Sequence, residues 1–355
     1  MPSFATGTVV GVLSERPGLQ RVLVDLPVEV GGPAAAGLTG TSEQRAYVLT
    51  ALVGPVEAGD RVVVNTTAVE RDLGTGGWHF VHWNLERERW SEEGPGHIMK
   101  LRYTSLQADA GSAEEHLDHL PSSLEGIPVV ACSVHSQVGC VAVALREGWP
   151  EARIVYVMTD GAALPLALSG LVAELGDTSV VDATVTAGHA FGGDREAVAV
   201  PSALAIARHE LGADAVVVGM GPGVVGTSTE LGTTAVEAAA VLDAVTALGG
   251  VPILAVRVSG GDERDRHRGL SHHSTTILDL VRSKVTLAAN PLLPEWVEGR
   301  HDVHTPPEVD LVAELDRRGL RITTMGRSPE QDRPFFEAAG DAGALAADLA
   351  RSAAG

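Results

Sequence analysis

The stretch IPVVACSV (residues 127–134) is apolar at almost every position, and the polar residues HSQ (135–137) follow it directly. A short run of this kind is typical of a strand buried on both faces of a sheet. Four more runs share this character, and stretches of helix length separate them. The sequence therefore predicts a doubly wound α/β layer with a mostly parallel sheet. The other runs are Arg153–Met158, Val180–Thr186, Ala215–Val218 and Pro252–Val258.

The intervening stretches predict the helices of this layer. We expect them over residues 138–147, 164–175, 200–211, 233–249 and 274–283. A late strand near Arg321–Thr324 and an Ala-rich helix over 335–352 are expected to close the chain. The Pro291–Pro307 stretch is expected to be a long loop with exposed His301 and His304.

Residues 1–95 have a different pattern, with short β-type runs separated by turn residues such as the Gly31–Gly40 stretch. Short strands with frequent turns favour a small antiparallel barrel or sandwich. The charged run Glu86–Glu93 marks the expected boundary, so we predict a barrel-like domain over 1–95 and an α/β domain over 96–355. The β-type runs are Thr8–Leu13, Arg21–Leu26, Ala46–Val53, Arg61–Val64 and Trp78–Trp83.

Composition limits the classes of partner. The chain has 46 acidic and 26 basic residues, for a formal net charge of -20. This balance argues against a nucleic-acid backbone or an anionic membrane as the main partner. Two cysteines cannot form a disulfide framework. Because no signal peptide and no apolar stretch of roughly 18 residues is found, a cytoplasmic protein is expected. A homodimer could cover apolar edges of the two domains.

Candidate catalytic residues follow the predicted strands. The carboxyl ends of parallel strands meet at one edge of a sheet, where ligands bind. Asp160 ends the second strand, and the glycine-flanked loop GHAFGGDRE places His189 and Asp194 after the third. These groups are candidates for proton transfer or for binding a divalent metal. The alternatives are a capping role for Asp160 and a solvated loop around His189.

His135 follows the first strand and is the fourth catalytic candidate. Ser136 is expected to cap the next helix, with His135 and Gln137 touching a ligand. A His–Ser pair is also found in serine hydrolases, but the chain has no Gly-x-Ser-x-Gly elbow. Serine-hydrolase chemistry is therefore disfavoured.

A glycine-rich segment, GMGPGVVGTST (219–229), follows the fourth strand. Glycines let backbone amides approach an anion closely, so the segment is a candidate phosphate or carboxylate loop, with a purely structural turn as the alternative. It formally matches the dinucleotide fingerprint, but it follows the fourth strand, the next helix begins late, and no acidic residue ends the next strand. A Walker A interpretation fails because a threonine replaces the lysine. The expected ligand-binding residues are Gly221, Gly223, Gly226, Thr227, Ser228 and Thr229.

The segment Asp262–Thr276 after the fifth strand is dense in charge, and Arg257 stands near the end of the strand itself. Arg257, Arg266 and Arg268 are expected to hold an anion. The chain contains no H-E-x-x-H or comparable signature, so a divalent metal could be bound only by pooling loops, for example Asp160, His189 and Asp194 with one of His272 or His273.

Six strings together resemble a known family. They are GHIMKLRYTSLQ, HSQ, MTDGAALP, GHAFGGDREAV, GMGPGVVGTST and HRGLSHHSTTIL. The chain is similar to the bacterial, mainly actinobacterial, family catalogued as domain of unknown function 3866. The resemblance covers nearly the whole chain and implies one shared architecture, but it carries no established activity.

Three functions are compatible with these observations. The leading hypothesis is an enzyme acting on a small anionic metabolite, phosphorylated or carboxylated, at the carboxyl edge of the sheet. The second is a non-catalytic protein that senses a nucleotide or phosphorylated metabolite. The third is a dinucleotide-dependent oxidoreductase that uses the glycine-rich loop.

Overall fold

The computed structural model describes residues 2–29 and 39–354, and this part of the chain forms two compact units. The first holds the residues up to Pro95 together with Leu101–Asp109, and the second holds Gly96–Lys100 and the residues from Ala110 onward. The turn expected over Gly31–Gly40 falls mostly outside the described residues. Among the described helices, none combines the length and the apolar character that a membrane crossing requires.

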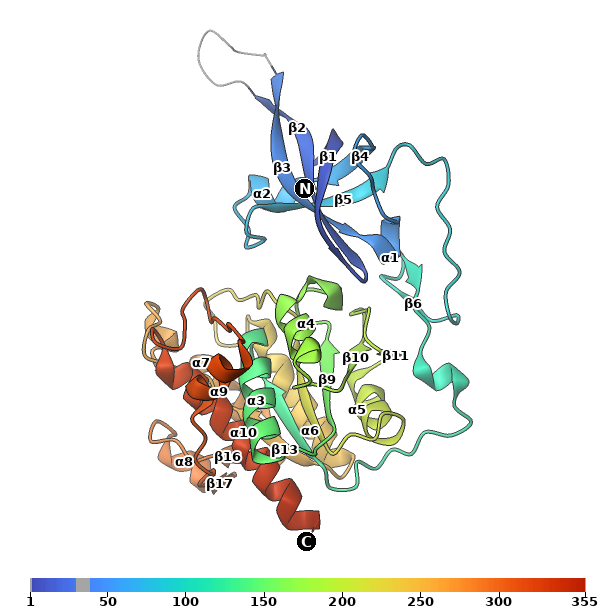
Figure 1. Cartoon of the computed structure of the whole chain (residues 1–355). Coiled ribbons are helices and arrows are strands. Elements are labelled where there is room, and N and C mark those ends of the chain that lie inside the picture. Colours follow the sequence, from blue (N-terminus) through green and yellow to red (C-terminus); the bar gives the residue numbers. More distant parts are fainter. Residues whose placement is uncertain (1, 30–38, 355) are drawn as a thin grey trace. The chain divides into compact units, whose positions relative to one another are not determined.

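The N-terminal unit is a closed five-stranded barrel with the strand order β1-β2-β3-β5-β4 (Figure 1). The predicted barrel is therefore confirmed. It is not wholly antiparallel, because β3 and β5 pair in parallel. The strands are β1 (Phe4–Arg16), β2 (Leu19–Glu29), β3 (Thr39–Leu49), β4 (Arg61–Asn65) and β5 (Trp78–Asn84), and the short helices are α1 (Thr50–Val53) and α2 (Thr67–Glu70).

Alternation along the barrel strands explains its core. Successive side chains of a strand point to opposite faces. Val62 and Val64 of β4 are fully buried, whereas Val63 between them is half-buried. The same period places Val22 and Val24 of β2 inside the barrel. The outward residues of β2, β3 and β5 are consequently free to carry aromatic and charged side chains.

The second unit contains an eight-stranded sheet with the order β11-β10-β9-β12-β8-β13-β16-β17. Every pair in it is parallel, which confirms the predicted α/β class. The strands are β8 (Pro128–Cys132), β9 (Ile154–Thr159), β10 (Ala183–Ala187), β11 (Arg195–Ala197), β12 (Ala215–Met220), β13 (Val251–Ala255), β16 (Thr286–Ala288) and β17 (Asp302–His304).

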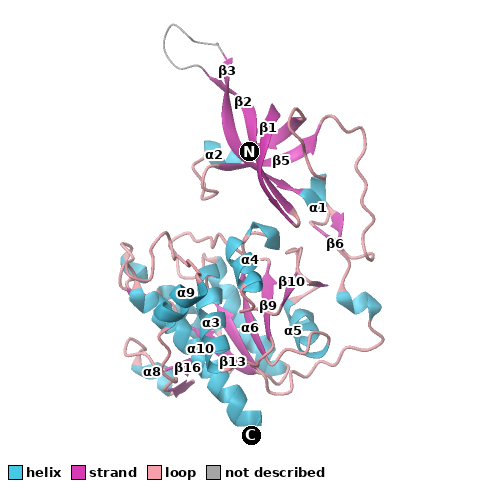
Figure 2. Ribbon diagram, in the orientation of Figure 1, coloured by secondary structure: helices cyan, strands magenta, loops and turns pink. Residues whose placement is uncertain are grey.

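Helices cover both faces of this sheet (Figure 2). Val130 and Cys132 of β8 pack with α3, α4, α9 and α10, and Val129 and Ala131 pack with α5, α6 and α7. One strand thus contributes to two cores, as its apolar run predicts. The helices are α3 (His135–Gly148), α4 (Gly170–Asp177), α5 (Val200–His209), α6 (Glu237–Ala247), α7 (His272–Leu280), α8 (Glu295–Glu298), α9 (Leu311–Arg318) and α10 (Arg333–Ala354).

Short elements complete the chain. They are β6 (Met99–Lys100), β7 (Ala108–Asp109), β14 (Val258–Ser259), β15 (Gly269–Leu270) and the 3-10 helices η1 (Ala113–His116), η2 (Leu166–Leu168), η3 (Thr234–Val236) and η4 (Asp265–His267).

Two expectations for the C-terminal part are wrong. Arg321–Thr324 is not a strand, because the chain turns back after it and makes only an isolated bridge between Thr324 and Arg327. The Pro291–Pro307 stretch is not a plain loop, since it contains α8 and β17. His301 lies between them and is only 2% exposed, whereas His304 is exposed as expected.

Candidate functional site

The carboxyl ends of β8, β12 and β13 lie side by side in the centre of the sheet. The helix that follows β8 packs on one face, whereas the helices that follow β12 and β13 pack on the other. Ligands of parallel sheets bind in the crevice that opens where neighbouring connections leave on opposite faces. The topology therefore places a crevice at the end of β8.

Two adjoining cavities occupy this edge, with volumes of about 370 and 150 Å³. Val224, Arg257 and Met325 line both. The larger cavity lies among the first turn of α3, the start of α4, residues 222–224 and residues 321–325. The smaller one lies among residues 224–229 and polar side chains of the segment after β13.

Arg257 stands between the two cavities and is only 2% exposed. Its Nη2 donates to Asp262 Oδ2 at 3.3 Å, and its Nη1 donates to His273 Nδ1 at 3.2 Å. Its Nε has no hydrogen-bond partner among the described residues. Burial lowers the pKa of Arg257 to about 10, so the guanidinium stays charged at neutral pH. A buried cation with an unused donor is an incomplete site for an anion.

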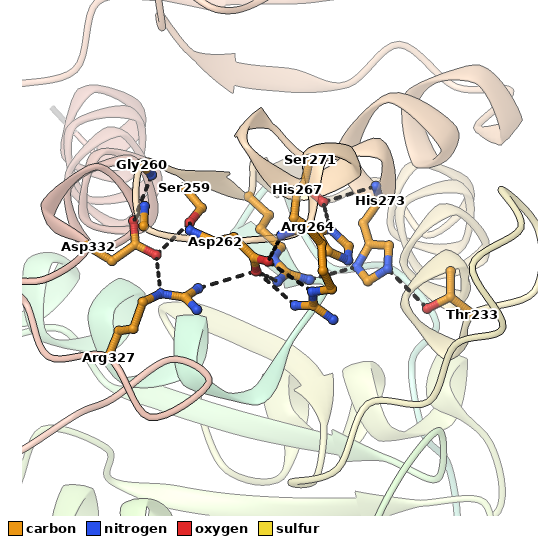
Figure 3. A network of polar contacts seen from close by, with 12 residues as sticks. Thr233, Ser259, Gly260, Asp262, Arg264, His267, Ser271, His273, Arg327 and Asp332 are labelled. Carbon is orange, nitrogen blue, oxygen red and sulfur yellow. Dashed lines mark hydrogen bonds and ion pairs between the residues drawn. The ribbon is translucent and has the colours of Figure 1, made fainter.

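Asp262 is the carboxylate at the centre of this cluster (Figure 3). It accepts from Arg264 Nε at 2.9 Å and Nη2 at 2.8 Å, and from Arg327 Nη2 at 3.3 Å in addition to Arg257. The Arg264 side chain, as the largest favourable influence, holds the pKa of Asp262 well below its usual range. One buried carboxylate is thus shared by three guanidinium groups.

Asp332, just before α10, is the second buried carboxylate of the network. It accepts from Ser259 Oγ at 2.6 Å, from the amides of Gly260 and Gly261, and from Arg327 Nε at 2.9 Å. Figure 3 shows Arg327 between the two carboxylates. Three arginines against two acids leave the cluster with an excess of positive charge.

Three histidines line the smaller cavity beside these arginines, and their ligand atoms lie within 4.8 Å of one another. Because a guanidinium only donates, His273 Nδ1 must accept from Arg257, and its proton lies on Nε2, which faces Thr233 Oγ1 at 3.3 Å. Burial, followed by Arg257, lowers the pKa of both His267 and His273 to about 3. Burial and then Arg266 lower that of His272. All three imidazoles are neutral at pH 7.

This grouping differs from the predicted metal set. His272 and His273 meet His267, whereas Asp160 and His189 lie at the ends of β9 and β10. The five-residue spacing of His267 and His272 is unsuitable for one helix, but η4 and β15 fold the segment back and bring the rings to 4.9 Å. Three histidines within seven residues were the sequence signal for His267.

The histidine cluster does not fit a divalent ion as it is arranged. A zinc-type site needs imidazole nitrogens with free lone pairs. Both nitrogens of His273 have hydrogen-bond partners, and the partner of Nδ1 is a cation. Arg257, Arg264 and Arg266 line the same cavity and would repel a metal. Its electrostatics favour an anion.

His135 lines the larger cavity, but both of its ring nitrogens are used. Nδ1 donates to the carbonyl of Met220 at 2.9 Å, and Nε2 accepts from Ser169 Oγ at 2.7 Å. Ser169 caps α4 and is only 3% exposed. Burial lowers the pKa of His135 to about 4, so it is a weak base. These contacts give His135 a role in positioning loops.

The prediction that Ser136 caps α3 is wrong, because the helix begins at His135 with Val134 as its N-cap. Gln137, in the first turn of the helix, accepts from the amides of Ser133 and Val134, which precede the helix. Its Nε2 donates to the carbonyls of residues 255 and 256. Gln137 is fully buried and does not line either cavity, so it ties β8 to β13.

Only some residues of the glycine-rich loop line the cavities. Gly223 and Gly226 line the cavities, as do Ser228 and Thr229. Gly221 does not; a Cβ there would lie 2.5 Å from the carbonyl of Ala163, so this glycine permits close loop packing.

Two further features shape this loop. Gly223 has a φ of 101°, a backbone conformation suited to glycine. Thr227 Oγ1 bonds Thr229 Oγ1 at 3.0 Å and shapes the loop from outside the cavities. No helix begins directly after Gly226, since η3 starts at Thr234.

Asp160 and His189 share the carboxyl edge with Gly223 but line neither of these cavities. Asp160 Oδ2 accepts the backbone amide of His189 at 2.9 Å, so the carboxylate ties the ends of β9 and β10 together. Lys100, only 1% exposed, donates to the carbonyls of Thr186 and Ala190 on either side of this loop and pairs with Glu196.

Asp194 is placed away from the carboxyl edge. It precedes β11, and its Oδ2 accepts from the amide and hydroxyl of Thr184, near the amino end of β10. Because β10 and β11 are parallel, the loop after β10 must return to the opposite edge before β11 begins. The sequence did not show that β11 exists, so Asp194 was grouped with His189.

Glu237, in the first turn of α6, was not predicted from the sequence. It accepts from Thr159 Oγ1 at the end of β9. Burial raises its pKa to about 7, and the charge of Asp160 acts in the same direction. A glutamate at the start of a helix is ordinarily a capping residue, so the sequence held no stronger signal.

The two exposed arginines of the charged segment are not equivalent. Arg266 lines the smaller cavity and forms no ion pair with any described carboxylate. Arg268 lines neither cavity and lies 3.8 Å from Asp265. Of the predicted anion ligands, Arg257 and Arg266 are therefore placed at the crevice, and Arg268 is not.

Residues 45–343 match the family described as "Protein of unknown function (DUF3866)". The match covers most of the 355 residues, so the chain belongs to this family, as its motifs indicate. The description states no activity. No curated protein and no solved structure matches the chain.

Proposed function

We propose that the protein binds a small anionic metabolite in the two adjoining cavities and acts on it as an enzyme. The observation that carries the proposal is Arg257, a buried guanidinium between the cavities whose Nε has no partner among the described residues. The surrounding excess of arginine over carboxylate favours negative charge in the ligand.

The sizes of the cavities support a two-part ligand. The smaller, polar cavity of about 150 Å³ suits a single phosphate or carboxylate group beside Arg264 and Arg266. The larger cavity of about 370 Å³ is within the range of small-molecule sites and would hold the body of the metabolite. His135 and Ser136 in the first turn of α3 line it, and the amides of a helix start favour an anion there.

His272 is the best-placed group for proton transfer. It is half-buried, lines the smaller cavity, and stays neutral at pH 7, so a ring nitrogen can accept a proton as general base. This assignment moves the proton-transfer role away from the residues predicted for it. Those residues are Asp160, His189, Asp194 and His135.

A thermal-shift screen tests binding. The panel comprises inorganic phosphate, phosphorylated and carboxylated metabolites, and neutral analogues of each. An anionic ligand at about 100 times its Kd should stabilise the protein by about 2.7 kcal/mol. Arg266→Gln should weaken binding at least tenfold without changing stability, because its side chain has no ion pair to lose.

Arg268→Gln is the matched control, since it removes the same charge from the same segment outside the cavities. Its affinity should stay within twofold of the wild type. The binding proposal is wrong if no anion stabilises the protein, or if the two variants lose affinity equally.

Turnover of an identified ligand tests catalysis. His272→Ala should lower kcat at least tenfold, and the rate should fall as pH drops below the lowered pKa of this residue, because only the neutral ring accepts a proton. His189→Ala should retain wild-type kcat. If His189→Ala lowers kcat and His272→Ala does not, the catalytic role belongs to the loop after β10 instead.

A non-catalytic sensor of a nucleotide or phosphorylated metabolite is the second candidate. The hydrogen bonds that engage both nitrogens of His135 and of His273 favour it, because they leave few free bases at the cavities. Ligand-dependent stabilisation with an unchanged ligand would support it. A dinucleotide enzyme is less favoured, since no helix starts directly after Gly226. NAD, NADP and FAD in the same screen test it.

A further inference from the structure

The outer face of the barrel carries a compact group of aromatic rings and arginines. Strand pairing sets Tyr47 of β3 opposite Arg21 of β2 and Phe80 of β5, and sets Arg45 opposite Trp78. These two rows are roughly 6.8 Å apart along the strands. We call these five residues the stacking face.

The rings of the stacking face contact one another. Tyr47 and Trp78 are stacked, with centroids 4.6 Å apart and an interplanar angle of 17°. Phe80 lies 5.6 Å from Tyr47. All three rings are half-buried, so an edge or face of each remains available. The whole chain has only three tyrosines, five tryptophans and five phenylalanines, which makes this concentration unusual for it.

The two arginines add charge to the rings. The Arg45 guanidinium lies 5.0 Å from the Trp78 ring centre, and that of Arg21 lies 5.7 Å from it. Neither arginine forms an ion pair with a carboxylate of the described residues. Arg45 donates instead to the carbonyl of Gly76 at 3.0 Å. Both cations are therefore available to phosphate groups.

An apolar cavity of about 350 Å³ adjoins this face within the same unit. Phe80 belongs to its wall, together with His82, Leu49 and Leu106. A planar ring of a ligand that extends beyond Phe80 would therefore have an apolar space to occupy beside it.

We propose that the stacking face binds single-stranded nucleic acid. Rings that tolerate any base, next to cations that contact the backbone, are the elements by which proteins bind single strands. Five-stranded Greek-key barrels that bind oligonucleotides do so on the face of their second and third strands, which is a likeness of fold alone. The net charge of -20 predicts no nucleic-acid partner for the whole chain. Asp25 and Glu43 pair in the next row of β2 and β3, so the positive charge of this face is confined to Arg21 and Arg45.

Fluorescence anisotropy of the full chain with a labelled 15-nucleotide oligothymidylate tests the proposal, in a salt series. Arg21→Gln/Arg45→Gln should weaken binding and reduce the slope of log K against log salt by about 0.7 for each arginine. This double variant removes no ion pair within the described residues, so it should fold normally. Trp78→Ala should weaken binding at least tenfold, because one stacking contact is lost.

Arg61→Gln, at the exposed start of β4 and outside the stacking face, is the control for loss of a surface charge and should keep wild-type affinity. A duplex of the same length should bind more weakly, because its bases are already stacked. Absence of binding at low salt overturns the proposal. Equal losses in the Arg61 and Arg21/Arg45 variants, or preference for the duplex or for a neutral oligosaccharide, also overturn it.

Discussion

The two halves of one sheet edge carry opposite electrostatics. At the ends of β9 and β10, Asp160 and Glu237 are neighbours, and the pKa of Glu237 is raised. At the ends of β8, β12 and β13, arginines exceed carboxylates, and the pKa values of the histidines are lowered. The two cavities described above lie on the second half. A shared edge therefore does not mean a shared site.

Removing Asp262 should have the largest effect on this contrast. Asp262→Asn leaves three guanidinium groups without their common carboxylate and should lower the free energy of unfolding by about 3–5 kcal/mol. Urea unfolding measures it. Asp265→Asn removes an exposed carboxylate three residues away and should change stability by less than about 0.5 kcal/mol. Similar values for the two variants would show that the buried network contributes nothing.

The second largest effect should be the loss of stability that acid causes through the histidines of the basic half. His267 and His273 have folded pKa values of about 3, below the usual 6.5 of the unfolded chain. The unfolded state therefore takes up protons first, and stability present above pH 6.5 is lost as pH falls toward 3. Unfolding in urea at a series of pH values measures this slope, which should be shallower in His267→Gln. An identical slope in that variant would contradict the assignment.

Glu237, on the acidic half of the edge, should make stability depend on pH in the opposite direction. Its folded pKa of about 7 exceeds the ordinary value of 4.5, so its contribution to stability is complete below pH 4.5 and is lost as pH rises through 7. Glu237→Gln removes this dependence. The variant should gain stability relative to the wild type by up to about 1.4 kcal/mol per pH unit in that window. A pH-independent difference between the two proteins would argue against a buried, proton-binding carboxyl.

The smallest effect is expected for Asp160. Asp160→Asn keeps an acceptor for the His189 amide and should change stability by less than about 0.5 kcal/mol. Burial is the main cause of the raised pKa of Glu237, and the variant removes the smaller contribution from the charge of Asp160, so that pKa should fall. Carboxyl-selective NMR titration of Glu237 measures the change. An unshifted titration would mean that the two carboxylates are not coupled.

Much of the architecture could be predicted, because apolar runs identify buried strands without knowledge of their neighbours. Ile127–Val134 predicted β8, and the short β-type runs separated by turns in the first 95 residues predicted the barrel. Strands of three residues, such as β11 and β16, carry too little pattern to be recognised. Missing β11 placed Asp194 on the wrong edge of the sheet.

The site was harder to predict, because the order of strands in a sheet cannot be inferred from the sequence of any single strand. The sequence placed Asp160 and Arg257 on the same edge, but it could not show that β12 and β8 separate β9 from β13. Arg257 could be placed at this edge because it is a polar residue near the end of an apolar run, and His273 was a candidate because it lies in a segment dense in charge. Glu237 and Asp332 were missed, because their burial arises from loops that approach them from distant parts of the chain.

Arg257 belongs to the wall of both cavities, and this has a consequence for how small fragments would bind. An anionic fragment in one cavity that accepts a hydrogen bond from Arg257 Nε also neutralises the positive charge that would attract an anion into the other cavity. When two such fragments bind at the same time, each should bind less tightly than it does alone. A single molecule that spans both cavities would not lose affinity in this way.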